Sequence, residues 1–420
     1  MTTTVCVDVT TSTTSSCTST ASTSGNFYIL NSNSISGYNI KSGTLTALSG
    51  GPLTLPSGVT PWAMAVDPTG SFLYVSTNGG ILFYNIGTGG KLTKVGSSVS
   101  LAGVAPVAMT IAPNGKFLLV STSSSGVFAY PITNGAVGST GVQVTQDLAS
   151  SIQVDTTSSW LVEAVPLVGS VVGVTLNAVP INSTTGAYTQ AAIHSLSLTV
   201  PNASLPNGQL AISGDDQNVF VALETGGTVV VPFNSANADP LPSTAASAIL
   251  IGVAHTGGSA LSVAVDPGTT PRLFYIGETL GVGNSGGLRA FTYASLSTPS
   301  SLVQASGSPI ASGGLAPSLI LPVATPDFVY VADGSGNING FAITAASGPV
   351  YTISTGSTVL AGSQPQGMAE DSTGSYLMEV GSSGSPYFDA YTFDSATPGQ
   401  LDSKVTSTAA ATSIAIVAAP

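Results

Sequence analysis

Charged side chains are scarce in this sequence. The chain has 420 residues but only 7 Lys and Arg and 19 Asp and Glu, so that 6% of its residues are charged, where a soluble domain usually has about 25%. The formal net charge is -12. Because so few dispersed cations cannot neutralise a phosphate backbone or an anionic bilayer surface, nucleic-acid binding and a basic membrane patch are both excluded.

Long uninterrupted hydrophobic runs are also missing. Hydrophobic residues make up 43% of the chain and the mean hydropathy is +0.41, which is enough apolar surface to build a folded core. The longest apolar stretch, residues 161–181, is broken by Glu163, two prolines and two glycines and is rich in valine. We therefore expect a hairpin of buried strands there and no membrane span in the chain.

The start of the chain has neither a cationic segment nor an apolar one, so no signal peptide is expected in this numbering. Residues 1–25 form a Ser/Thr-rich extension that contains both cysteines, Cys6 and Cys17. A disulfide between them would close a short loop and indicate an oxidising compartment, whereas two free thiols are the alternative. No further Cys or His accompanies the pair, so we expect no metal site and no cofactor.

The rest of the chain is organised by a repeat. An aromatic or aliphatic residue followed two positions later by another such residue marks a short strand, and the pattern returns every 46 to 60 residues. The eight copies are Tyr38-x-Ile40, Tyr84-x-Ile86, Tyr130-x-Ile132, Val179-x-Ile181, Val231-x-Phe233, Phe291-x-Tyr293, Phe341-x-Ile343 and Tyr391-x-Phe393. Repeats of this length are typical of solenoids and propellers.

Further strands accompany each copy. A second strand lies about ten residues earlier, as in Leu73-Tyr74-Val75, and a fourth follows, as in residues 91–95. Between an earlier strand and the second lies a turn of the type Asp67-Pro-Thr-Gly70, in which Asp caps a type I turn that Pro and Gly favour. We expect a structural role for Asp67 and for its counterparts Asp266 and Asp371. Four short strands per unit, without helical periodicity, predict an all-β fold built of β-propeller blades.

The two ends of the repeat array complement each other. The first unit begins at its second strand, residues 27–30, while residues 412–417 have the pattern of an inner strand that no further strand follows. We expect this C-terminal strand to complete the first blade and close the ring, which leaves no open sheet edge. The prediction is a single propeller domain over residues 26–420 with eight four-stranded blades. Seven blades are the alternative if residues 148–208 do not form a full one.

The repeat resembles a known family. The sequence Ala-Val-Asp-Pro-x-Gly-x-x-Leu-Tyr-Val at residues 65–75, then Tyr84-x-Ile86 and Gly90-x-Leu92, is similar to the secreted YVTN-type propellers and to the lactonase propellers related to 6-phosphogluconolactonase and carboxymuconate cyclase. The resemblance covers nearly all of the chain after residue 25. It implies a propeller fold and a lactone-converting enzyme with His, Glu and Arg on one face of the ring.

One set of residues fits that expectation. His255 lies in the loop ahead of the sixth blade, Glu278 ends the second strand of that blade, and Arg289 begins its third strand. Glu224 and Asp333 hold nearly equivalent positions in the two adjacent blades. An imidazole close to carboxylates and a guanidinium can act as general acid and base on an ester carbonyl, and ordinary polar loops are the alternative interpretation.

A calcium loop is a weaker possibility at residues 333–340. The sequence Asp-Gly-Ser-Gly-Asn-Ile-Asn-Gly contains the right donors but lacks the distal Glu, and it aligns with hairpin turns of other blades. A tight turn is the better interpretation, and no metal ligand is predicted.

A structural role competes with the enzyme. A neutral surface rich in Ser, Thr and Gly can associate with copies of itself without desolvating ions. Residues 2–11 alternate like a strand, with Val5, Val7 and Val9 on one side, and could add to a neighbouring subunit's sheet. The main prediction is therefore a self-assembling extracellular, cell-surface or periplasmic propeller whose partner is itself. A lactonase-like hydrolase and a monomeric ligand-binding propeller are the alternatives.

Overall fold

Short antiparallel strands form almost all of the regular structure in the computed structural model of this protein. The structure describes residues 25–41, 44–101, 104–167, 172–205, 209–266, 273–279, 286–293, 302–323, 328–334, 336–347, 350–360, 363–371, 374–384, 388–393, 400–407 and 413–419. Within these ranges the helical elements are two short 3-10 turns, η1 (Thr88–Gly90) and η2 (Ala245–Ser247). The strands form eight separate sheets, which we number as blades 1 to 8.

Blades 1 to 4 come from the first half of the chain, together with its last strand. From the inner to the outer strand, blade 1 contains β35 (Ser413–Ala418), β1 (Gly25–Asn31), β2 (Ser34–Lys41), β3 (Thr44–Ala47) and β4 (Leu53–Thr54). Blade 2 contains β5 (Pro61–Val66), β6 (Phe72–Thr77), β7 (Gly80–Ile86) and β8 (Leu92–Lys94). Blade 3 contains β9 (Pro106–Ile111), β10 (Phe117–Thr122), β11 (Gly126–Thr133), β12 (Ala136–Val137) and β13 (Val142–Thr145). Blade 4 contains β14 (Ser151–Val154), β15 (Trp160–Leu167), β16 (Gly173–Pro180) and β17 (His194–Thr199).

Blades 5 to 8 follow in the same inner-to-outer order. Blade 5 contains β18 (Leu210–Ile212), β19 (Asn218–Ala222), β20 (Thr228–Pro232) and β21 (Ile249–Ile251). Blade 6 contains β22 (Ser259–Val265), β23 (Leu273–Thr279), β24 (Gly286–Thr292), β25 (Val303–Gln304) and β26 (Ile310–Ala311). Blade 7 contains β27 (Pro317–Pro322), β28 (Phe328–Asp333), β29 (Asn337–Ser347) and β30 (Val350–Leu360). Blade 8 contains β31 (Ser363–Glu370), β32 (Tyr376–Gly384), β33 (Phe388–Phe393) and β34 (Leu401–Ser407).

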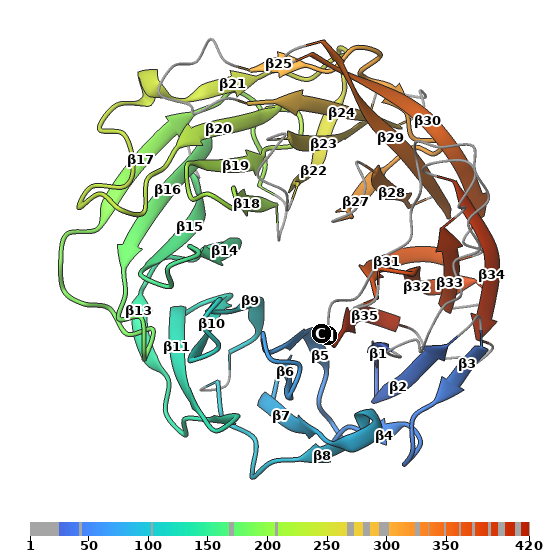
Figure 1. Cartoon of the computed structure of the whole chain (residues 1–420). Helices are drawn as coiled ribbons and strands as arrows, with labels where there is room; N and C mark the ends of the chain where they lie inside the picture. Colours follow the sequence, from blue (N-terminus) through green and yellow to red (C-terminus); the bar gives the residue numbers. More distant parts are fainter. Residues whose placement is uncertain are drawn as a thin grey trace.

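The blades follow one another around a ring, with the inner strands at its centre (Figure 1). The predicted eight-bladed propeller is confirmed, since residues 148–208 supply the complete blade 4. The apolar stretch within it forms the predicted hairpin of β15 and β16. In blades 1, 3 and 6 the outer position is divided between two short strands instead of one. Glycine and proline, as in Gly50-Gly51-Pro52 between β3 and β4, interrupt those outer edges.

The C-terminal strand closes the ring as predicted. β35 pairs antiparallel with β1, placing Phe27 opposite Ala418 and Ile29 opposite Ile416. The Ala419 amide donates to the Asn26 carbonyl at 2.9 Å and extends the pairing past the strand end. Blade 1 is therefore assembled from the two ends of the described chain, and backbone hydrogen bonds between β35 and β1 close the ring.

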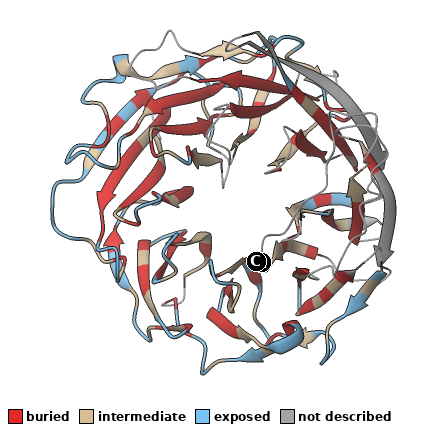
Figure 2. Cartoon of the chain, in the orientation of Figure 1, coloured by how far each residue is buried: buried red, intermediate tan, exposed pale blue. Residues whose placement is uncertain are grey.

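The core is divided into eight apolar clusters among the described residues, one at each boundary between neighbouring blades. Second and third strands supply most of the fully buried residues, and these strands carry much of the red colour in Figure 2. Because successive residues of a strand point to opposite sides of a blade, Leu73 packs toward blade 1 and Tyr74 toward blade 3. Each blade is thus buried on both of its sides.

Aspartates cap the turns between first and second strands. Asp67 Oδ1 accepts hydrogen bonds from the Ser71 and Phe72 amides at 2.8 and 2.6 Å. Asp371 accepts from the two equivalent amides after it. The predicted turn-capping role is confirmed at both positions. At Asp266 the turn that follows lies outside the described residues.

Within the described ranges, no helix has the length and hydropathy needed to cross a membrane.

Candidate functional site

One face of the ring carries both the loops that lead into the inner strands and the turns between second and third strands. The pairing register shows why: Pro61 at the start of β5 lies opposite Thr77 at the end of β6. In blade 7, Pro317 lies opposite Asp333 in the same way. We call this side of the ring the entry face. The five candidate residues predicted from the sequence lie on it or just beneath it.

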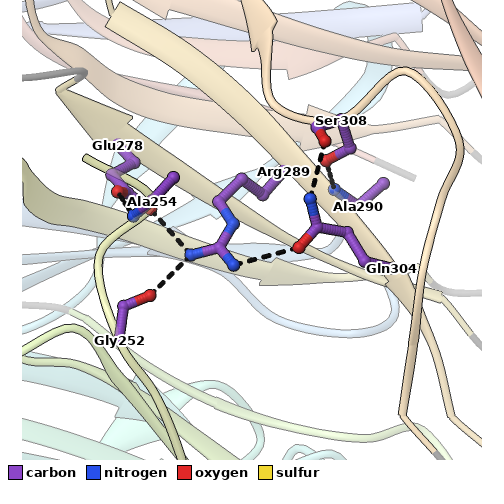
Figure 3. A network of polar contacts seen from close by, with 7 residues as sticks. All are labelled: Gly252, Ala254, Glu278, Arg289, Ala290, Gln304 and Ser308. Atoms are coloured by element: carbon purple, nitrogen blue, oxygen red, sulfur yellow. Dashed lines mark hydrogen bonds and ion pairs between the residues drawn. The ribbon is translucent and has the colours of Figure 1, made fainter.

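The structure brings Glu278 and Arg289 into direct contact. Arg289 Nη1 lies 3.1 Å from Glu278 Oε2, and both side chains are almost fully buried at the boundary between blades 5 and 6 (Figure 3). The guanidinium also donates to the Gly252 carbonyl at 2.7 Å and to Gln304 Oε1 at 3.0 Å. Its carbon lies 5.1 Å from the centre of the Phe291 ring, within cation–π range. Arg289 therefore acts inside the fold, where its charge is paired.

This pair holds the loop that leads into blade 6. Glu278 accepts a hydrogen bond from the Ala254 amide, while Arg289 holds the Gly252 carbonyl two residues earlier. His255 follows directly and is exposed, and its carbonyl accepts from the Gly258 amide at 2.8 Å. The buried ion pair therefore fixes the backbone on which the imidazole is mounted.

Glu224 lies at the end of blade 5 that faces this loop of blade 6. Its backbone exchanges two hydrogen bonds with Ala260, at 2.9 and 3.0 Å, and Ala260 lies opposite Glu278 in the sheet of blade 6. The Glu224 side chain is half-buried. The structure thus places the backbones of Glu224, Ala260 and Glu278 side by side, with the His255 loop entering β22 beside them.

Asp333 lies one blade farther round the ring. Its two carboxylate oxygens accept hydrogen bonds from the Leu315 and Ala316 amides at 3.0 and 2.7 Å, just before β27 begins. Asp333 lies opposite Asn337, and the Gly336 amide donates to the Asp333 carbonyl at 2.9 Å, which agrees with the predicted tight turn. Like Glu278, Asp333 holds the loop that leads into its own blade.

A further titratable group, absent from the five sequence candidates, lies at the boundary between blades 3 and 4. Glu163 on β15 is fully buried and accepts a hydrogen bond from Thr145 Oγ1 at 2.6 Å. Its cross-strand neighbour Asn177 donates to Asp147 at 2.9 Å and accepts from Ser195 at 2.7 Å. Burial raises the pKa of Glu163 to about 7; the Thr145 hydrogen bond lowers it, and the Asp147 carboxylate raises it. The group therefore titrates near neutral pH while enclosed by the fold.

The sequence does carry a signal for this group. Blade 4 reads Leu161-Val162-Glu163 where blade 2 reads Leu73-Tyr74-Val75, so a carboxyl stands at an apolar core position. In blade 8, Glu379 has the equivalent register and is also fully buried, opposite Asp389. A charged residue that interrupts a repeated apolar pattern is thus the feature that reveals it.

Metal binding finds no support in the described ranges, where no three His, Cys, Asp or Glu side chains are grouped so as to hold an ion. The predicted disulfide residues Cys6 and Cys17 lie outside the described residues, as do Val5, Val7 and Val9 of the predicted assembly strand.

The resemblance to lactonase propellers is confirmed by a family model. The model of the lactonase seven-bladed β-propeller family matches residues 17–158, which reach from the end of the N-terminal extension into blade 4. No curated protein matches the chain in sequence. The described residues form eight blades, one more than the name of the matching family states.

Solved structures share the fold along most of the chain. The periplasmic gluconolactonase of Pseudomonas aeruginosa is 14% identical with a TM-score of 0.55, over 95% of this chain and 99% of that one. A candidate 6-phosphogluconolactonase of Bacteroides fragilis is 12% identical with a TM-score of 0.55, again over 95% and 99%. A dihydro-haem d1 dehydrogenase is 10% identical with a TM-score of 0.60, over 93% of this chain and 74% of its own. Since these structures differ in chemistry, the likeness establishes the fold alone.

Proposed function

We propose that this protein is a hydrolase of small lactones whose reaction takes place on the entry face, at the boundary between blades 5 and 6. The observation that carries the proposal is the convergence there of an exposed His255 and a half-buried Glu224 above a buried Glu278–Arg289 pair. The match to the lactonase family model and the likeness to a gluconolactonase support this choice of reaction.

The proposed reaction uses one group that accepts a proton from water and one group that binds a hydroxyl of the substrate. His255 accepts a proton from water as the water oxygen bonds to the lactone carbonyl carbon. The ring C–O bond then breaks, and the leaving alkoxide takes that proton back from the imidazole, so that a hydroxy acid is released. Glu224 is suited to accept a hydrogen bond from a substrate hydroxyl beside the reacting ring.

Glu278 and Arg289 serve as positioning residues in this scheme. Every hydrogen bond found for the Arg289 guanidinium is made within the fold, and Glu278 is bound to Arg289 and to the Ala254 amide. They hold the His255 loop in place and do not contact the substrate. The family resemblance implied His, Glu and Arg on one face of the ring, and Arg289 lies buried beneath that face.

The test measures hydrolysis of D-glucono-1,5-lactone by continuous titration of the acid released. We expect His255→Ala to lower kcat by about 100-fold or more, the usual contribution of a general base. His194→Ala is the matched control, because His194 is the other histidine of the chain and lies on the outer strand β17, paired with Asp239. The absence of hydrolysis by the parent protein, or equal rates in the two variants, would contradict the proposal.

A location outside the cytoplasm is part of the same proposal. It is supported by the Ser/Thr-rich, charge-poor composition and by the likeness to a gluconolactonase described as periplasmic. Fractionation of the native cells, followed by detection with an antibody, tests it. Recovery of the protein from the cytoplasmic fraction alone would overturn this part.

A further inference from the structure

The inner strands share an irregularity near the entry face. In six of the eight described blades the pairing between the first and second strands skips one residue of the inner strand, which forms a β-bulge. The skipped residues, which we call the bulge ring, are Ile414, Trp62, Val107, Leu261, Ser318 and Gln366 in blades 1, 2, 3, 6, 7 and 8. Bulges that recur at one level of a fold re-aim side chains and are common beside binding sites.

Burial separates these residues from the residue that precedes each of them, although Ile414 still packs partly against the core between blades 1 and 2. The residue before each skipped one is buried, and in four blades it is a proline, as in Pro61 and Pro365, whose missing N–H suits a break in the ladder. The skipped residues themselves are half-buried or exposed, and Trp62 is 49% exposed. The inner strands surround the centre of the ring (Figure 1), so the bulge ring lies around that centre at the entry face.

The loop contacts described above fix the bulges in place. Asn78 accepts from the Thr60 amide at 2.7 Å, two residues before Trp62, and Asp333 accepts from the Ala316 amide two residues before Ser318. In blade 6 the residue after Leu261, Ser262, donates to the Pro317 carbonyl at 2.8 Å and ties the bulges of blades 6 and 7 together. A ring held in this way needs little reorganisation to receive a ligand.

The side chains of the bulge ring are uncharged and divide into an apolar group and a group that forms hydrogen bonds. Blades 1, 2, 3 and 6 contribute the apolar side chains of Ile414, Trp62, Val107 and Leu261, and Trp62 adds one large, exposed aromatic surface. Blades 7 and 8 contribute the hydroxyl of Ser318 and the amide of Gln366. No described inner strand carries Lys or Arg, so a phosphate group would find no cation in the strands around this centre.

We infer that the bulge ring is the substrate-binding rim and that it selects an uncharged sugar lactone over a phosphorylated one. The inference rests on the proposed function and names its substrate class. The less polar face of the sugar ring stacks on Trp62, while its hydroxyls bind Gln366 and Ser318. The His255 loop enters the ring on the same face, six residues before Leu261, so the rim and the proposed base share one face of the ring.

The test measures binding separately from catalysis by using a stable analogue, D-glucono-1,5-lactam, and its 6-phosphate. The chain has two tryptophans, and Trp160 is 9% exposed with its indole N–H bonded to the Ser235 carbonyl, so quenching by a ligand at the rim reports on Trp62. We expect the lactam to quench the fluorescence of the parent protein. In calorimetry, Trp62→Ala should weaken binding about fivefold or more, while Trp62→Phe keeps most of the affinity.

Two comparisons complete the experiment. Leu250→Ala is the matched control, because Leu250 is 50% exposed but lies on the outer strand β21, and it should leave the affinity unchanged. The 6-phosphate should bind about tenfold more weakly than the neutral lactam, since no cation compensates its desolvation. Equal binding of the two analogues, or a Trp62→Ala variant that binds like the parent, overturns the inference.

The same measurements distinguish this inference from the proposed function. Hydrolysis of the lactone that is unaffected by Trp62→Ala and Gln366→Ala leaves the enzyme in place and rejects the rim. Trp62-dependent binding of the lactam without any hydrolysis supports the rim and rejects the enzyme. The absence of both rejects both.

Discussion

Glu163 occupies a position that blades 2 and 3 fill with valine. In the register of the inner strands it corresponds to Val75 and Val120, which belong to the core. Keeping a carboxyl there favours its protonated form, because a charge in the interior loses its hydration. The hydrogen bond from Thr145 satisfies one oxygen of the carboxyl group, which is a polar group within an otherwise apolar layer at the boundary of blades 3 and 4.

Stability should therefore depend on the protonation of Glu163. The folded pKa is about 7 against an ordinary 4.5, so the folded state retains the proton more strongly. This contribution is fully present below pH 4.5 and is lost as the pH rises toward 7. Over that range we expect the free energy of unfolding of the parent to fall relative to Glu163→Gln by up to about 3 kcal/mol, measured by urea titration at several pH values. Parallel curves for the two proteins would contradict the assignment.

At the scale of the element, small polar devices decide how each blade is built. Aspartates cap the turns after inner strands, and residues at the ends of second strands, such as Glu278 and Asp333, hold the loops that enter the blades. Glycines begin several third strands; at Gly126, φ is 83° and a Cβ would collide with the Thr145 carbonyl of the outer strand. These features recur because every blade has the same order of strands and therefore needs turns and loops at the same places.

Among the strands, β35 should matter most for the stability of the ring. Removing residues 413–420 should expose the edge of β1 and leave blade 1 without its inner strand, so we expect a large loss of thermal stability and aggregation. Circular dichroism melting and gel filtration measure both effects.

The control restores the strand at the other end of the chain. Ala418 lies opposite Phe27, so residues 413–419 can be joined by a short linker to Gly25 in a chain that lacks residues 1–24. This permuted protein should recover the melting temperature of the same chain with its native C-terminus. A truncated protein that stays monomeric and melts like its parent would show that ring closure contributes little.

At the scale of the whole molecule, the low charge affects whether copies of the protein associate with one another. Few ions must be desolvated when two such surfaces come into contact, and the described strands from β1 to β35 form a closed ring. The expectation that the N-terminal segment adds to a neighbouring subunit therefore stays a prediction beside the enzymatic proposal.

Light scattering at low salt, followed by electron microscopy, tests self-assembly. If the segment is donated, the full chain should form large oligomers or filaments, and deletion of residues 1–24 should abolish them while the melting temperature of the ring is retained. Replacing Val5, Val7 and Val9 with Asp should act like the deletion, whereas Thr2→Asp is the matched control outside the apolar side. A monomeric full chain at millimolar concentration would end this hypothesis.

The amino-acid sequence by itself determined the blades. Its evidence was the period-two strands, the Asp-Pro-x-Gly turns and the complementary ends of the repeat array. Each of these is a pattern of residues close together in the chain, so it can be recognised in the sequence alone. They predicted the closing strand and eight blades, with seven as an alternative that the structure excludes because residues 148–208 form blade 4. They also predicted that His255, Glu278 and Arg289 lie near one another at one end of blade 6, and the structure places them at or just beneath the entry face.

Only the tertiary structure decided what those residues do. Arg289 is held by Gly252, 37 residues away, and Glu163 by Thr145 of another blade, and such partners are set by packing between blades rather than by neighbouring sequence. The bulge ring depends on a one-residue slip in strand pairing, for which the Pro-x pair within four of the inner strands is a partial signal. Side chains separated in sequence meet because the ring closes around them, and this is why the candidate site emerges from the fold and not from any single motif.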